Sequence, residues 1–371
     1  MPARELFDQA EFNMQVCNAC RYCEGFCAVF PAMERRLTFA QADLRYLANL
    51  CHGCGACYYA CQYAPPHEFH VNVPRNFAQV RAETYARYAW PGFLACLFAR
   101  NGTVVSLATA AALALFLLAT FWFQAPAVIF AAHPGGDFYK VIPHGVMVWT
   151  FGVVALYVLL ALAVGFVRFW RETGEPLHQF VEPASLGRGL LDALHLKNLK
   201  GGGDGCPYPD ERPSHARRIY HHLTFYGFMF CFAATCVGTI YHYAFGWKAP
   251  YALTSLPVVL GTIGGIGLIV GPLGLLRLKS KRDPDTDEPS QTGMDAGFLW
   301  LLLLTSATGL ALLGLRETAA MGTLLAVHLG VVLGLFLTLP YGKFVHAVYR
   351  VAALVRAALE RSRPMPNVTF E

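Results

Sequence analysis

Two cysteine runs with identical spacing near the start of the chain constrain its fold more than any other feature. Each run reads C-x2-C-x2-C-x3-C. The first consists of Cys17, Cys20, Cys23 and Cys27, and the second of Cys51, Cys54, Cys57 and Cys61. Three thiolates at this spacing lie on one tight turn and can bind three irons of a cubane cluster. We therefore expect short helices and turns in this region, wrapped around metal.

The fourth cysteine of each run lies too far round the turn to join its own three. In the bacterial ferredoxin pattern it binds the neighbouring cluster instead. The spacing thus predicts two [4Fe–4S] clusters with exchanged fourth ligands. One cluster would be held by Cys17, Cys20, Cys23 and Cys61, and the other by Cys51, Cys54, Cys57 and Cys27. Proline often follows the fourth cysteine of this pattern, but Ala28 and Gln62 stand there, which affects the turn more than the ligation.

Zinc and disulfides explain the two runs less well than iron does. Structural zinc sites usually have C-x2-C pairs separated by a longer spacer. The segment from Met1 to Phe12 has no apolar core typical of a signal peptide, so the cysteines are expected in the reducing cytoplasm, where disulfides are rare. His52, inside the second run, either hydrogen-bonds a cluster sulfur or is an ordinary turn residue.

Four further cysteines lack this spacing: Cys96, Cys206, Cys231 and Cys236. Cys231 and Cys236 lie in an apolar segment and are expected to be small packing residues. Cys206 follows the glycine-rich stretch 201–205, and both a functional role and an ordinary loop role stay open for it.

The rest of the chain is apolar enough to lie in a membrane. Hydrophobic residues make up 55% of the sequence and charged residues 14%, against about 25% charged in soluble proteins. A membrane-spanning helix needs about 20 mostly apolar residues. Six segments qualify: 103–123, 145–168, 219–244, 256–277, 296–315 and 320–348.

The predicted fold is therefore mostly α-helical, with two domains. Residues 1–90 are expected to form a ferredoxin-like domain with two [4Fe–4S] clusters. Residues 91–371 are expected to form a six-helix, cytochrome-b-like domain in the lipid bilayer, with a long loop at 169–218. A loop of that length inside a compact membrane domain is more often functional than idle.

Lysine and arginine predict the orientation. The loops 124–143 and 245–255 and the turn after the fifth span hold one each, at Lys140, Lys248 and Arg316. The alternate side is much richer, with Arg168, Arg171, Lys197, Lys200, Arg212, Arg217, Arg218, Arg277, Lys279, Lys281, Arg282, Lys343, Arg350, Arg356, Arg361 and Arg363. Because positive loops stay in the cytoplasm, we expect a bacterial inner-membrane protein with both termini and the cluster domain cytoplasmic. The net charge of +5 follows from this distribution and does not indicate nucleic-acid binding.

Histidines inside predicted spans are functional suspects, because ionisable residues are rare in a membrane. The third and sixth spans contain His221, His222, His242, His328 and His346, and His144 opens the second span. Histidines on two helices can hold a haem between them. The positions therefore predict one or two b-type haems.

Helical geometry selects the pairs. On one continuous sixth helix, 18 steps from His328 to His346 are close to five turns, so both would share a face. On the third span, His221 shares a face with His242 better than His222 does. Because these spans run in opposite directions, His221 should pair with His346 on the cytoplasmic side, and His242 with His328 on the outer side. His222 and His144 stay open as alternatives.

The sequence resembles the tricarballylate-utilisation protein B (CitB-type) family. The resemblance lies in the segments Cys17–Pro31 and Cys51–His67, and continues in Asn198–Gly203 and Gly205–Cys206. The cluster motif alone is shared by many ferredoxin-like proteins, whereas its combination with six spans and the glycine-rich stretch is more specific.

The resemblance implies an electron-transfer subunit. Its partner would be a separate FAD-dependent dehydrogenase that oxidises a tricarboxylate such as tricarballylate. The chain would re-oxidise that flavin through iron–sulfur clusters and haem and pass the electrons to membrane quinone. Whether the chain is itself an enzyme stays open, because no catalytic residue is identified. It contains no P-loop and no GxGxxG opening a helix after a strand, so FAD or NAD binding by this chain is not expected.

Two alternative functions are compatible with part of the sequence. A redox-regulated tricarboxylate transporter would use the six spans. This sequence, however, has no arginine or lysine inside the spans, apart from their ends, to pair with substrate carboxylates. A haem and iron–sulfur oxygenase component, similar to a cobalamin-biosynthesis enzyme, would need an open haem coordination position, which paired histidines exclude.

Overall fold

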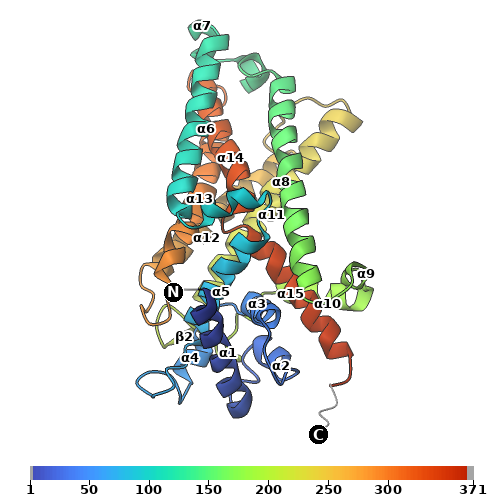
Figure 1. Cartoon of the computed structure of the whole chain (residues 1–371). Coiled ribbons are helices and arrows are strands. Elements are labelled where there is room, and N and C mark those ends of the chain that lie inside the picture. Colours follow the sequence, from blue (N-terminus) through green and yellow to red (C-terminus); the bar gives the residue numbers. More distant parts are fainter. Residues whose placement is uncertain (1–2, 366–371) are drawn as a thin grey trace.

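The computed structural model of the protein describes residues 3–365. It consists of a bundle of long helices with a smaller helical domain at one end (Figure 1). Within these described residues, six helices are long and apolar enough to cross a membrane, as predicted. They are α6 (Asn101–Phe123), α8 (His144–Glu172), α11 (Ala216–Ala244), α12 (Leu256–Lys279), α13 (Thr292–Leu315) and α14 (Met321–Thr338), the last two extended by adjoining 3-10 turns.

The smaller domain, here called the cysteine domain, contains five helices from the start of the chain. They are α1 (Ala3–Cys20), α2 (Val29–Met33), α3 (Gln41–Leu50), α4 (Ala56–Tyr59) and α5 (Val73–Tyr88). Tyr46, Leu47 and Phe77 are completely buried in its core. The expectation of short helices is wrong for α1 and α5, because their apolar residues pack on each other and on α3 and stabilise longer helices than local pattern indicates.

The connections carry the remaining elements. Short helices are α7 (Pro126–Ile129), α9 (Leu177–Phe180) and α10 (Pro183–Leu194). The 3-10 turns are Gly92–Phe98, Pro134–Gly136, Phe138–Lys140, Pro289–Gln291 and Leu339–Tyr341. The strands β1 (Cys206–Pro207) and β2 (Pro213–Ser214) pair antiparallel. The predicted loop at 169–218 is thus largely structured.

The sixth span ends earlier than predicted. The prediction of one helix over 320–348 is wrong, because α14 passes into the turn Leu339–Tyr341 and the backbone is extended at Gly342. Pro340 and Gly342 are the helix-ending residues in this segment. The chain then forms a separate helix, α15 (Val345–Ser362). His346 therefore lies on α15, whereas His328 lies on α14. The prediction that both residues share one face of one helix is wrong.

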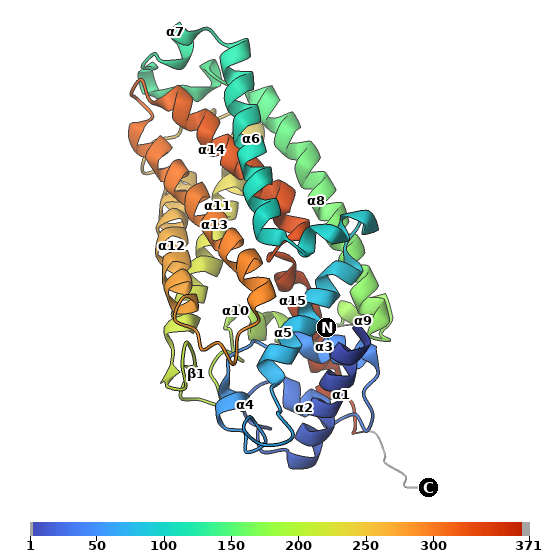
Figure 2. The same ribbon diagram turned by 60° about the vertical axis from the view of Figure 1, so that its left-hand side comes forward.

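The helix α15 runs from the bundle into the cysteine domain (Figure 2). It packs against α3, α8 and α10. Its residues Ala352 to Glu360 are buried. Inside the domain, Glu360 accepts hydrogen bonds from the Tyr46 hydroxyl at 2.9 Å and from Arg36 at 2.5 Å. The last helix of the chain is thus part of the core formed by the first helices.

Close packing of α10 on α15 makes a testable contribution to stability. A Cβ on Gly189 would lie 2.7 Å from Val355 Cγ2, whereas Gly187 has open space around it. Gly189→Ala should therefore destabilise the protein by about 1–3 kcal/mol through overpacking. Gly187→Ala, on the same helix, should be neutral or stabilise it by up to about 1 kcal/mol. Thermal unfolding in detergent, followed by circular dichroism, checks this; equal midpoints for the two variants would contradict it.

Candidate metal centres

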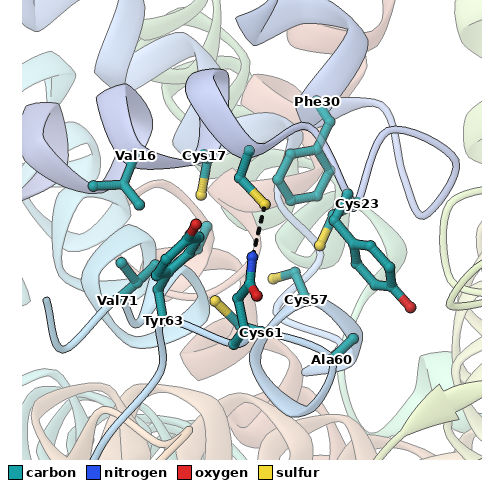
Figure 3. A pocket seen from close by; sticks show the side chains of 13 residues that line it. Val16, Cys17, Cys23, Phe30, Cys57, Ala60, Cys61, Tyr63 and Val71 are labelled. Carbon is teal, nitrogen blue, oxygen red and sulfur yellow. Dashed lines mark hydrogen bonds between the residues drawn. The ribbon is translucent and has the colours of Figure 1, made fainter. Parts of the chain in front are cut away.

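The first group of cysteines surrounds a cavity of about 150 Å³ in the cysteine domain (Figure 3). Cys17 and Cys20 lie at the end of α1, Cys23 in the turn that follows, and Cys61 just after α4. All four line the cavity together with Cys57, and Val16, Phe30, Tyr63 and Val71 form apolar walls. The structure therefore brings the four residues of the first predicted ligand set to one cavity.

The second group surrounds an adjacent, smaller cavity. It is lined by Cys27, Cys51, Cys54 and Cys57, the second predicted set. Cys51 and Cys54 are buried in the segment between α3 and α4. Cys57 borders both cavities, so the two groups are direct neighbours. The exchanged positions of Cys27 and Cys61 match the predicted arrangement, while the ligation itself stays a prediction.

The donor set suits a bound metal cluster. Burial, reinforced by the neighbouring thiols, raises the pKa of Cys17 and of Cys23 to about 12. Burial likewise raises the pKa of Cys27 and of Cys57 far above the usual thiol value. Thiolates crowded into such a site repel one another unless a cation neutralises them. Bound iron supplies that cation, so the residues fit an iron–sulfur cluster.

Three arginines from distant helices hold the second cysteine loop in place. Arg81 of α5 donates to the Cys51 carbonyl at 3.1 Å, and Arg350 of α15 donates to the same oxygen at 2.8 Å. Arg217 of α11 donates to the carbonyl oxygens of Gly53 at 2.7 Å and of His52 at 3.0 Å. The loop is thereby attached to both the membrane helix α11 and the C-terminal helix α15. In the sequence, Arg217 and Arg350 indicate only the orientation of the spans.

Arg217 has a matched control beside it in the chain. Arg217→Ala removes two hydrogen bonds from a charged donor, each worth about 1.5–3 kcal/mol. Its neighbour Arg218 donates to the His195 carbonyl instead. We expect Arg217→Ala to lose iron from the second cysteine group several times faster than Arg218→Ala during air exposure. Iron and labile sulfide measured over time test this, and equal loss rates in the two variants would contradict it.

His221 and His346 lie about one turn along α11 and α15 from Arg217 and Arg350, which hold the second cysteine loop. Their ring centroids are 6.3 Å apart and the rings are nearly perpendicular, at 84°. His346 Nδ1 donates to the Lys343 carbonyl at 2.6 Å, which leaves Nε2 free. Within residues 3–365, the buried His221 Nδ1 has no hydrogen-bond partner. The structure thus brings the predicted inner pair together, from α11 and α15.

These two histidines fit the ligands of a haem iron. A backbone hydrogen bond from one ring nitrogen is how proteins orient a metal-binding histidine. Burial and the charges of Lys343 and Arg350 lower the pKa of His346 well below its usual value, so the ring is neutral. His52 Nδ1 donates to the Leu50 carbonyl at 2.8 Å, and its ring is buried rather than on a surface turn. Its carbonyl oxygen accepts from Arg217, which lies about one turn before His221 on α11.

The predicted outer pair is not brought together. The ring of His242 stacks on that of His144 at 4.0 Å, with 12° between the planes. His328 lies against α13, where its Nδ1 is 3.0 Å from Thr308 Oγ1 and a Cβ on Gly309 would touch its ring. The predicted pairing of His242 with His328 rests on shared helix faces and opposite helix directions, which do not show that α11 and α14 are neighbours.

Comparison with known proteins gives a consistent result over most of the chain. The family model described as "Citrate utilization protein B" matches residues 98–367. The model described as "Citrate utilization protein B Fer4-like domain" matches residues 10–87. A protein named "Citrate utilization protein B" from Escherichia coli is 54% identical over 358 residues, which cover 96% of this chain and 93% of that protein. No solved structure matches.

Proposed function

Because the chain belongs to the citrate utilization protein B family, we propose that it is a membrane electron-transfer subunit. In this proposal it re-oxidises a separate FAD-dependent dehydrogenase acting on a tricarboxylate such as citrate or tricarballylate, and delivers the electrons to quinone. The observation that carries the proposal is the arrangement of two adjacent cysteine groups near the half-buried pair His221 and His346.

The proposed cofactors are two [4Fe–4S] clusters and one or two b-type haems. When bound, such groups take up and release single electrons. Cys17, Cys20, Cys23 and Cys61 would hold one cluster, and Cys51, Cys54, Cys57 and Cys27 the other. His221 and His346 would hold a haem on the side of the cysteine domain. His242 and His328 remain proposed ligands on the far side, where His144 is the nearer neighbour of His242.

In this proposal, the exposure of each cysteine group gives the direction of electron transfer. Tyr22, which borders the first cavity, is 69% exposed, so a soluble partner can approach this group closely. In the second group Cys51 and Cys54 are buried, and so is the neighbouring residue His52. Arg217 connects this group to α11, the helix that carries His221. The order from surface to membrane is first group, second group, histidine pair.

The proposed location is a bacterial inner membrane, with the cysteine domain and both termini in the cytoplasm. The excess of lysine and arginine on the side of the cysteine domain supports this orientation. A soluble dehydrogenase in the cytoplasm would then have direct access to the first cysteine group.

Substrate-dependent quinone reduction tests the proposed function. The full-length chain is co-purified with a candidate flavoprotein dehydrogenase, and its tricarboxylate and a water-soluble quinone are added anaerobically. We expect quinone reduction only when both proteins are present. Flavoprotein alone reducing quinone at the same rate would contradict the proposal.

A further inference from the structure

A strap formed by the glycine-rich stretch and the β1–β2 hairpin, residues 201–214, lies over the second cysteine group. Gly201, Gly202, Gly203 and Gly205 all have positive φ, which lets the chain turn back sharply on itself. The strap reaches the cysteine loop at Gly55, where a Cβ would lie 2.7 Å from the Pro207 carbonyl oxygen. The guanidinium of Arg217 lies over the ring of Tyr208 in the strap and also donates a hydrogen bond to the carbonyl oxygen of Gly53.

The strap carries Cys206 into contact with a cysteine of the second group. Cys206 is 1% exposed and packs with Cys54, Ala56 and Leu199 in one buried apolar cluster. The next residues of the two segments are also in contact, since Pro207 lies against Gly55. As a cluster ligand Cys54 would be a thiolate without a proton, so the thiol of Cys206 is the donor of the pair and the sulfur of Cys54 the acceptor.

We propose that Cys206 is a positioning residue that donates an S–H···S hydrogen bond to Cys54 and thereby raises the reduction potential of the second cluster. The inference rests on the proposed ligation of that cluster by Cys51, Cys54, Cys57 and Cys27. A donor at a ligand sulfur stabilises the extra negative charge of the reduced cluster. The second cluster would be a better electron acceptor than it would be without this bond, which favours transfer away from the surface.

The proposed role of Cys206 as a hydrogen-bond donor differs chemically from the role of a cluster ligand. A cluster ligand is a thiolate that lines the cluster cavity, whereas Cys206 does not line the second cavity and would keep its proton as a donor. The second cavity already has four cysteines without Cys206. Deleting Cys206 should therefore change the potential of the second cluster and leave its iron in place.

The test is an EPR-monitored redox titration of the full-length protein, with chemical mediators and no partner. The variants are Cys206→Ala and Cys206→Ser, and Cys231→Ala in α11 is the control. Cys206→Ala should lower one cluster's midpoint by about 59 mV, a tenfold shift of its reduction equilibrium. Cys206→Ser, which keeps a hydroxyl donor, should shift it less, and the other cluster and the iron content should be unchanged.

Two results would overturn the inference. Unchanged midpoints in Cys206→Ala would show that the hydrogen bond has no electronic effect, and loss of about four irons per chain would make Cys206 a ligand. Absence of cluster signals from the unsubstituted protein would instead contradict the proposed function. The two failures are thus distinguishable.

Discussion

Replacing Cys61 with alanine is expected to remove the cluster at Cys17, Cys20 and Cys23, although Cys61 belongs to the second run in the sequence. Cys61 lines the same cavity as those three residues. A cubane without its fourth thiolate in a partly exposed site loses iron readily, so the iron content should fall from about eight to about four per chain. Cys27→Ala should have the same effect on the other cluster.

Comparison of the surviving EPR signals makes this result specific. Cys61→Ala should leave the same signal as Cys20→Ala, and Cys27→Ala the same signal as Cys54→Ala. Cys96→Ala, at an exposed cysteine away from both cavities, is the control and should keep all the iron. If Cys61→Ala matched Cys54→Ala instead, each run would bind its own cluster and the exchanged ligation would be wrong.

Replacing His221 with alanine is expected to abolish the b-type absorption of one haem. His221 faces His346, whereas the next residue, His222, has its ring beside Tyr226. Loss of one axial ligand weakens haem binding and changes its spectrum. Haem content should therefore fall by one per chain in His221→Ala and in His346→Ala, but stay unchanged in His222→Ala.

Pyridine haemochrome analysis and reduced-minus-oxidised spectra measure this effect. The far-side residues provide an internal comparison, since His328→Ala should leave the haem at His221 intact. Full haem content in both His221→Ala and His346→Ala would remove the inner haem from the proposal.

The parts of the fold that depend on local patterns could be predicted from the sequence. Cysteine spacing fixes which thiols share a turn, and the length of an apolar run fixes whether it can cross a membrane, so both groups and all six spans were identified. The sequence also predicts the pair His221 and His346, whose rings the structure brings together, but it places His346 on the sixth span and not on the separate helix α15. The break at Leu339–Tyr341 has a local signal in Pro340 and Gly342, which the hydrophobicity of the segment outweighed.

The parts that depend on packing between distant segments could not be predicted. The contact of His242 with His144 requires knowing that α8 and α11 meet at their far ends. The burial of α15 in the cysteine domain joins the two ends of the chain. The role of Arg81 at the Cys51 carbonyl depends on the same long-range packing. In the sequence Cys206 is only a cysteine that follows a run of glycines, and its spacing does not predict a contact with Cys54.

The most direct test of the account is the rate of haem reduction by a reduced flavoprotein partner, measured by anaerobic rapid mixing. The unsubstituted protein is compared with Cys54→Ala, which should lack the second cluster, and dithionite confirms that the haem of both is reducible. We predict rapid haem reduction in the unsubstituted protein and a loss of at least about 100-fold in Cys54→Ala, because the gap between the first group and His221 is then unbridged. Equal rates in the two proteins would contradict a path through the cysteine groups.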